Sequence, residues 1–242
     1  MSTPKAISTA RVDERVQRAR SSGAWAIALV ALLIVGSLYL IFLYAPRERV
    51  MGDVQRVFYI HLPLAWNGLL AFAVTFVLSI LYLKTRRAGF DRWAAASAEV
   101  GLLFTTLMLI TGSLWARAAW GTYWTWEPRL TTAFLLWLMY AFYVILRRYI
   151  ENRDKMRLLA AVYGIVAFIN VPIVFMSIRW WRTLHPVVIK SSGFQMEPEM
   201  VQTLMVALVS FTIFYGLLLW ERARLAQVEE RVERLRERIR EV

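Results

Sequence analysis

The sequence contains no cysteine and only two histidines in 242 residues. Without cysteine the chain has no disulfide, no thiolate metal site and no thiol redox chemistry. Two histidines fall short of a zinc site, which generally needs three or four ligands, and no cluster of carboxylates or imidazoles supplies the others. Thiol chemistry and an ordinary zinc site are therefore excluded.

Charged residues are also scarce, at 19% of the chain, whereas 59% of the residues are hydrophobic and the mean hydropathy is +0.48. A soluble domain of this composition would expose far too much apolar surface, so the composition indicates a membrane protein. Six stretches are nearly free of charge, and most reach the roughly 20 residues that a helix needs to cross a bilayer. They are residues 24–45, 57–83, 93–116, 130–146, 158–178 and 200–220. We predict an all-α polytopic membrane protein with six transmembrane helices.

The basic residues predict which side of the membrane each loop faces. Of 29 lysines and arginines, 21 lie in residues 1–23, 84–92, 147–157 and 221–242, and the other eight lie in 46–56, 117–129 and 179–190. The richer segments face the cytoplasm by the positive-inside rule, and an even number of spans places both termini there. The net charge of +12 therefore reflects topology and contact with the inner leaflet. We expect no nucleic-acid partner, because the basic residues are dispersed and no nucleic-acid-binding motif joins them.

These patterns divide the chain into a cytoplasmic basic tail (1–23), a six-helix membrane domain (24–220) and a cytoplasmic charged helical tail (221–242). In the last segment apolar residues recur every three or four positions, which is a heptad-like pattern. Two interpretations of this tail stay open. It docks to a partner subunit or another helix, or it is a solvated basic extension held near anionic lipid.

One outer loop, residues 115–129, is unusually aromatic. The ten residues from Trp120 to Arg129, "WGTYWTWEPR", contain three tryptophans, a tyrosine, a carboxylate and an arginine. Tryptophan is common at membrane interfaces, but an aromatic belt explains one or two residues per span end, not four between Trp115 and Trp126. Glu127 and Arg129 form a charge pair at a span boundary, where charges are more often placed for a function.

Both histidines belong to the other two outer loops. In the first, residues 46–61, apolar residues at helical spacing predict a short interfacial helix that delivers His61 to the second span. In the third, His185 precedes Pro186, which favours an extended backbone. Two imidazoles at one membrane face suit local hydrogen bonds or a metal bound from two sides. They complete the coordination of haem iron, because the porphyrin supplies the four equatorial nitrogens.

A porphyrin is a flat apolar plate with two carboxylates on one edge, so it needs aromatic surface and nearby cations. The outer loops offer both. The aromatic candidates are Trp115, Trp120, Tyr123, Trp124 and Trp126, and the cationic ones are Arg129 with Arg56, Arg117, Arg179 and Arg182.

These residues match a known signature. "WGTYWTWEPRLTT" (120–132) resembles the W-G-x-x-W-x-W-D-x-R-L-T pattern of the haem-handling proteins of cytochrome c biogenesis, the tryptophan-rich WWD-motif family. Six spans, this chain length and one histidine in each flanking outer loop resemble the CcmC branch, since larger relatives carry more spans and more histidines. The resemblance extends from Ala24 to Trp220.

The resemblance implies that His61 and His185 are axial ligands of haem b at the periplasmic face of a bacterial inner membrane. It places Trp120, Trp124, Trp126 and Arg129 in the haem-binding loop. It further implies delivery of haem to a periplasmic chaperone (CcmE-like), in which a histidine bonds covalently to a haem vinyl group. A small single-span subunit (CcmD-like) and an ABC transporter (CcmA/CcmB-like) are the other implied partners. Whether a protein that promotes the covalent step counts as a haem lyase-like enzyme is a matter of definition, since positioning alone lowers such a barrier.

Two positions depart from the usual signature. Glu127 stands where the family has aspartate, and it is followed by Pro128. The longer side chain reaches differently, so its role transfers least directly. Tyr123 stands where many members have another tryptophan, which keeps the flat surface and adds a hydroxyl.

Two other functions remain open from the sequence. A subunit that moves haem across the membrane would need a polar route, and only Glu99 and Asn170 suggest one, although Asn170 with Pro172 is better explained as a helix kink. A bis-histidine electron-transfer cytochrome would normally ligate its haem within the bundle, whereas both histidines here lie at one rim.

Overall fold

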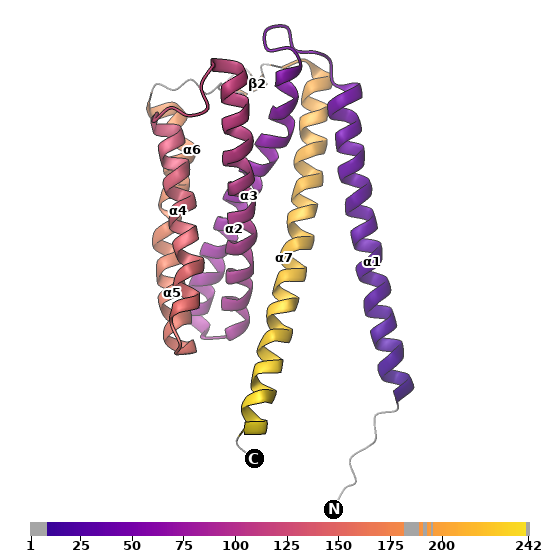
Figure 1. Ribbon diagram of the computed structural model, residues 1–242, viewed down its shortest axis with the longest axis vertical. Helices are drawn as coiled ribbons and strands as arrows, with labels where there is room; N and C mark the ends of the chain where they lie inside the picture. Colours follow the sequence, from indigo (N-terminus) through magenta and orange to yellow (C-terminus); the bar gives the residue numbers. More distant parts are fainter. Residues whose placement is uncertain (1–8, 182–188, 191–192, 195, 241–242) are drawn as a thin grey trace, which may run out of the picture.

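The computed structural model describes residues 9–181, 189–190, 193–194 and 196–240. Its long helices run alternately up and down through a bundle (Figure 1). The helices are α1 (Thr9–Tyr39), continued by a π-helical turn (Leu40–Tyr44), a 3-10 turn (Asp53–Val57), α2 (Phe58–Thr85), α3 (Ala88–Trp120), α4 (Pro128–Tyr149), α5 (Arg153–Phe168), α6 (Asn170–Trp180) and α7 (Pro198–Arg240).

Six helical segments among the described residues are long and apolar enough to cross a membrane, with α5 and α6 together forming one of them. The predicted six-span helical fold is thereby confirmed. A hairpin of two short strands, β1 (Ile189–Lys190) and β2 (Gly193–Phe194), pairs antiparallel before α7. The start of α1 and the end of α7 lie at the same end of the bundle (Figure 1). The assignment of that end to the cytoplasm stays a prediction from the basic residues.

The break between α5 and α6 has a local cause. Pro172 has no backbone N–H to donate to the carbonyl four residues earlier, so the helical hydrogen-bond ladder is interrupted near Ile169. The Asn170 side chain donates a hydrogen bond to the Thr132 carbonyl of α4 at 3.0 Å. The predicted kink is present, and its polar residue is used to hold α4.

The closest helix contact joins α2 to α3. A Cβ atom added at Gly68 would lie 2.6 Å from Cγ2 of Thr105, and one at Gly101 would lie 2.8 Å from Ala71 Cβ. Real side chains do not approach so closely, so glycine is required for the two backbones to meet at this distance. This contact fixes the height of each residue of α2 against α3, including those at the end that carries the aromatic loop.

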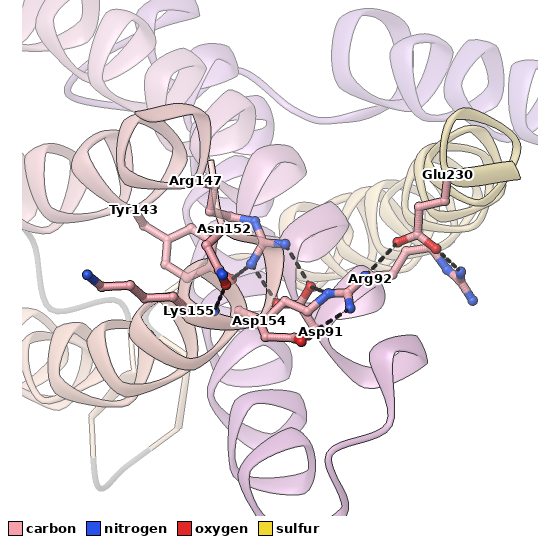
Figure 2. Close-up of polar contacts among 9 residues, drawn as sticks. Asp91, Arg92, Tyr143, Arg147, Asn152, Asp154, Lys155 and Glu230 are labelled. Atoms are coloured by element: carbon pink, nitrogen blue, oxygen red, sulfur yellow. Dashed lines mark hydrogen bonds and ion pairs between the residues drawn. The ribbon is translucent and has the colours of Figure 1, made fainter. Parts of the chain in front are cut away.

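At the opposite end, charged side chains from four helices meet (Figure 2). Asp91 of α3 is 4% exposed and accepts two hydrogen bonds from the Arg147 guanidinium of α4, at 2.6 and 2.8 Å. Arg157 of α5 lies 3.5 Å from the Asp91 carboxylate and 3.6 Å from Glu230 of α7. Glu230 also accepts from Arg92 at 3.0 Å. This network ties the extended end of α7 to the rest of the bundle.

The first helix is peripheral. The Ser37 hydroxyl of α1 donates to the Ser210 hydroxyl of α7 at 2.9 Å, a contact between two small residues that lets the helices approach. Between Gly23 and Tyr39 much of α1 is exposed and apolar, including Trp25 and Leu32. A lipid bilayer satisfies such a surface, which agrees with a membrane-spanning helix.

The topology can be tested by cysteine labelling, because the natural chain has no cysteine background. Val50 is 91% exposed in the loop after α1, and Ile239 is 75% exposed near the end of α7. We expect a membrane-impermeant maleimide to label Val50→Cys in intact spheroplasts and to label Ile239→Cys only after the membrane is permeabilised. The reverse pattern would contradict the predicted orientation.

The charged network predicts a stability effect. Asp91→Asn removes the charge that compensates a largely buried Arg147, and such a loss costs about 3–5 kcal/mol. We expect the purified protein to melt about 10 °C lower than the wild type. The matched control is Asp154→Asn, because the Asp154 side chain is 94% exposed and lies 3.7 Å from Arg157. Equal melting temperatures for the two variants would show that the network contributes little.

Candidate functional site

His61 lies near the start of α2, and the segment before it determines how it gets there. The Glu48 carboxylate accepts the backbone N–H groups of Val50 and Met51, and Gly52 adopts a positive φ of 58°. Residues 46–52 therefore form a turn, and the helix begins at Asp53. The predicted interfacial helix over residues 46–61 is wrong for this first part, because a side chain captures the N–H groups that a helix would use. The expectation that a helical segment leads His61 into the second span is correct, because the 3-10 turn Asp53–Val57 continues directly into α2.

Arg56 holds this loop to the end of the first span. Its Nη1 atom donates to the backbone carbonyls of Ile41 and Ala45, and its Nε atom donates to the Asp53 carboxylate at 3.2 Å. These contacts give Arg56 a structural role in positioning the chain before His61. A contact between Arg56 and a haem propionate, as predicted, would have to be made in addition to these bonds.

The His61 ring packs against α3. Its Nδ1 atom lies 3.1 Å from the Thr111 hydroxyl, and its ring centre lies 6.2 Å from that of Trp115. Trp115 is 3% exposed and belongs to a buried cluster with Phe58 and Tyr59. An imidazole held on two sides in this way has a defined orientation, which a metal ligand requires.

The aromatic signature joins the end of α3 to the start of α4. Helix α3 ends at Trp120, where Gly121 adopts a φ of 77° and donates its N–H to the Arg117 carbonyl, a left-handed cap that favours glycine. Helix α4 begins at Pro128, a favoured first helical position, with Glu127 as the N-cap residue. The glycine and the proline of the signature thus set the two ends of a short connection.

The aromatic rings form two groups and not one flat surface. The rings of Trp115 and Trp120 lie 5.7 Å apart, and that of Trp115 lies beside His61. On the α4 side, Trp124 meets Trp126 edge to face at 5.7 Å with an interplanar angle of 79°. The fifth aromatic candidate, Tyr123, is 57% exposed and lies under the Arg117 guanidinium. Edge-to-face packing is a stable arrangement for such rings.

Three of the predicted site residues line one cavity at this end of the bundle. His61 comes from α2, Trp124 from the connection and Arg129 from the first turn of α4, where its Nη1 donates to the Val174 carbonyl at 2.6 Å. The cavity has a volume of about 40 Å³, enough for very small molecules. The guanidinium, the imidazole and the indole therefore converge, but a macrocycle does not fit between them.

A larger apolar groove lies on the other side of Trp124. It opens outward over about 540 Å³ and is lined by Trp124, Trp126, Phe134 and residues of α3. Leu109 and Trp124 line both spaces, so they form the wall between the His61 cavity and the groove. The groove is of the size that binds a drug-sized or larger flat ligand.

Several buried polar atoms at this end have no hydrogen-bond partner among the described residues. They include Nε1 of Trp115, Nε1 of Trp124 and Oγ1 of Thr131. Buried donors without partners are rare in proteins, and each marks a place where a ligand or water completes the bonding. Of these donors, the Trp124 N–H belongs to a residue that lines the same cavity as Arg129.

His185 and Arg182 lie outside the described residues. The flanking helix ends are described: α6 ends at Trp180 and α7 begins at Pro198, both at the end of the bundle that holds the aromatic loop (Figure 1). Two residues near His61, Thr111 and Gly112, were not singled out from the sequence. In the sequence they are an ordinary threonine and glycine within an apolar span, and no motif distinguishes them.

Residues 6–238 match the protein family described as CcmC, heme exporter protein C. A heme exporter protein C from Bradyrhizobium diazoefficiens is 35% identical over 193 residues, which cover 79% of this chain and 73% of that protein. A putative cytochrome c biosynthesis ccmC-like mitochondrial protein from Marchantia polymorpha is 30% identical, over 75% of this chain and 77% of the relative. A heme exporter protein C from Rhodobacter capsulatus is 29% identical, over 88% of this chain and 90% of the relative.

Proposed function

This chain belongs to the heme exporter protein C (CcmC) family, multi-pass membrane proteins of haem export and cytochrome c maturation, and on that basis we propose its specific task. The protein binds haem b at the outer face of the membrane, the periplasmic face in a bacterium. It then delivers the haem to a periplasmic chaperone of the CcmE type.

The observation that carries this proposal is the convergence of His61, Trp124 and Arg129 on one cavity at the end of the bundle that carries the tryptophan-rich connection. The three residues come from separate elements and supply an imidazole, an indole and a guanidinium. Iron ligation, aromatic packing and carboxylate pairing are the three interactions that a haem needs from a protein.

The residues around the cavity fit haem by their chemistry. The groove beside Trp124 and Trp126 offers apolar aromatic surface to a macrocycle, and the Trp124 N–H and the Arg129 guanidinium offer donors to propionates. Because the cavity at His61 is small, Trp124 and Leu109 have to shift for a plate in the groove to reach the imidazole. The other predicted site residues lie in the tryptophan-rich loop and the adjoining helix ends, and in this proposal they support these groups. They are Trp115, Trp120, Tyr123, Glu127 and Arg56.

The second axial ligand in this proposal is His185. An iron in haem accepts one imidazole on each face of the macrocycle. His185 is the one other histidine of the chain, and it lies in the sequence between α6 and α7, whose adjoining ends are at the His61 end of the bundle. That position supports ligation of one iron from both sides.

Delivery requires an acceptor on the same side of the membrane. Family membership implies partners from the cytochrome c maturation system, and we infer a CcmE-like chaperone, a CcmD-like single-span subunit and CcmA/CcmB-like transporter subunits. The contribution of this chain to a covalent haem transfer is to hold one reactant in register for the other, which lowers the barrier by reducing the entropy lost in the encounter.

The two residues that the sequence offered for a polar route through the membrane have local structural partners. Glu99 accepts hydrogen bonds from Arg222, and Asn170 donates to a backbone carbonyl, so each has a local structural partner. The buried hydroxyls of Thr75 and Thr105 donate to backbone carbonyls four residues earlier. These four groups therefore serve helix packing, and the contacts of Glu99 and Asn170 give neither residue a role in carrying haem.

Axial ligation predicts the behaviour of histidine variants. We expect His61→Gly and His185→Gly, purified from cells that make haem, to lose the six-coordinate low-spin optical spectrum and to regain it when imidazole is added. Imidazole restores the missing ligand without restoring the side chain. An unchanged spectrum in both variants would exclude ligation by these residues.

The groove predicts the effect of removing an exposed tryptophan. Trp126→Ala should weaken haem binding about tenfold in a haem titration of the purified protein, because about 1–2 kcal/mol of aromatic contact is lost. Trp25→Ala is the matched control, since Trp126 is 74% exposed and Trp25 is 77% exposed on the distant helix α1. Equal haem affinity for the two variants would count against the groove.

A further inference from the structure

The Thr111 hydroxyl has two backbone acceptors within its own helix. Its Oγ1 atom lies 2.8 Å from the Leu107 carbonyl and 3.2 Å from the Met108 carbonyl, the usual acceptors for a threonine within a helix. A hydroxyl has one proton, and we assign that proton to the carbonyls because both lie within hydrogen-bond distance. The lone pairs of Oγ1 are what remain for His61, whose Nδ1 lies 3.1 Å away.

This direction fixes the tautomer of His61. An oxygen that presents lone pairs to Nδ1 favours the imidazole with hydrogen on Nδ1, which donates to Thr111. In that tautomer the ring lone pair is on Nε2. The tautomer of a metal-binding histidine is commonly set by the hydrogen bond that its other nitrogen makes.

Gly112 allows the ring to lie against α3 while it makes this bond. A Cβ atom at Gly112 would lie 2.9 Å from Cε1 of His61 and 3.4 Å from Nδ1. Trp115, one turn further along α3, closes the next position, with its ring 6.2 Å from that of His61. Thr111, Gly112 and Trp115, within about one turn of α3, therefore all lie against the His61 ring.

We propose that Thr111 is a positioning residue that holds His61 as the Nδ1–H tautomer and so presents Nε2 to haem iron. The inference rests on the proposed function, and it adds the group that selects the ligating nitrogen. By accepting the hydrogen bond from Nδ1–H, Thr111 also makes the imidazole donate electron density to the metal more strongly. This lowers the midpoint potential of the haem.

The test uses the full-length protein with haem bound. Thr111→Val keeps the size of the side chain and removes the hydroxyl, whereas Thr111→Ser keeps the hydroxyl. We expect Thr111→Val to bind haem about 10–100-fold more weakly and to shift the midpoint potential in the positive direction, and Thr111→Ser to match the wild type. Thr212→Val, which removes a hydroxyl bonded to a carbonyl in α7, controls for the loss of any membrane threonine.

A second measurement does not depend on the native side chain at position 61. In His61→Gly, imidazole retains an N–H for Thr111, whereas 1-methylimidazole binds iron but has no N–H to donate. We expect imidazole to bind roughly 3- to 10-fold more tightly, and this preference to disappear when Thr111→Val is added. A preference that persists in the double variant would reflect the methyl group and would overturn the inference.

The outcomes separate the two proposals. If His61→Gly loses the low-spin spectrum but Thr111→Val has wild-type affinity and potential, His61 is a ligand and Thr111 does not position it. If His61→Gly keeps an unchanged spectrum, ligation by His61 fails, and the positioning role of Thr111 fails with it.

Discussion

The close contact between α2 and α3 is the constraint on which the rest of the molecule depends. Gly68 and Gly101 let the two backbones meet where any Cβ atom would collide, so the relative height of the helices is fixed. Because of that register, His61 of α2 lies beside Thr111 and Trp115 of α3. In a bilayer, where apolar surface gives no preference for helix over lipid, close packing and hydrogen bonds between helices determine such a register.

Much of the fold was predictable because the bilayer imposes it. Stretches of about 20 apolar residues must be helical, so the six spans follow from hydropathy alone. The sequence did not reveal the buried network at the other end, in which Asp91 pairs with Arg147 and Arg157. These residues belong to the segments richest in lysine and arginine. Counting charges predicts the side of the membrane that each loop faces, but it does not show which charged residues pair. The turn at Gly52 was missed for a similar reason, since a helical spacing of apolar residues does not show that Glu48 captures the backbone.

The candidate site was predictable in its location and not in its internal arrangement. Alternation of the spans puts His61 and the tryptophan-rich connection at one end, and the structure has them there. Trp115 meets the imidazole from within α3, whereas the placement of Trp124 and Trp126 depends on residues 121–127, which have no periodicity to follow. Trp124 lines the cavity, whereas Trp126 and Tyr123 are mostly exposed. The expected flat platform is a set of tilted rings, because neighbouring indoles pack edge to face.

A structure of the full-length protein purified with haem, determined by electron microscopy, tests most directly whether two outer loops share one iron. We expect the imidazole nitrogens of His61 and His185 to be bonded to the same iron from opposite faces. The macrocycle should lie along the groove of Trp124 and Trp126, with Arg129 near its propionates. A haem ligated by neither histidine, or two histidines facing different spaces, would contradict this arrangement.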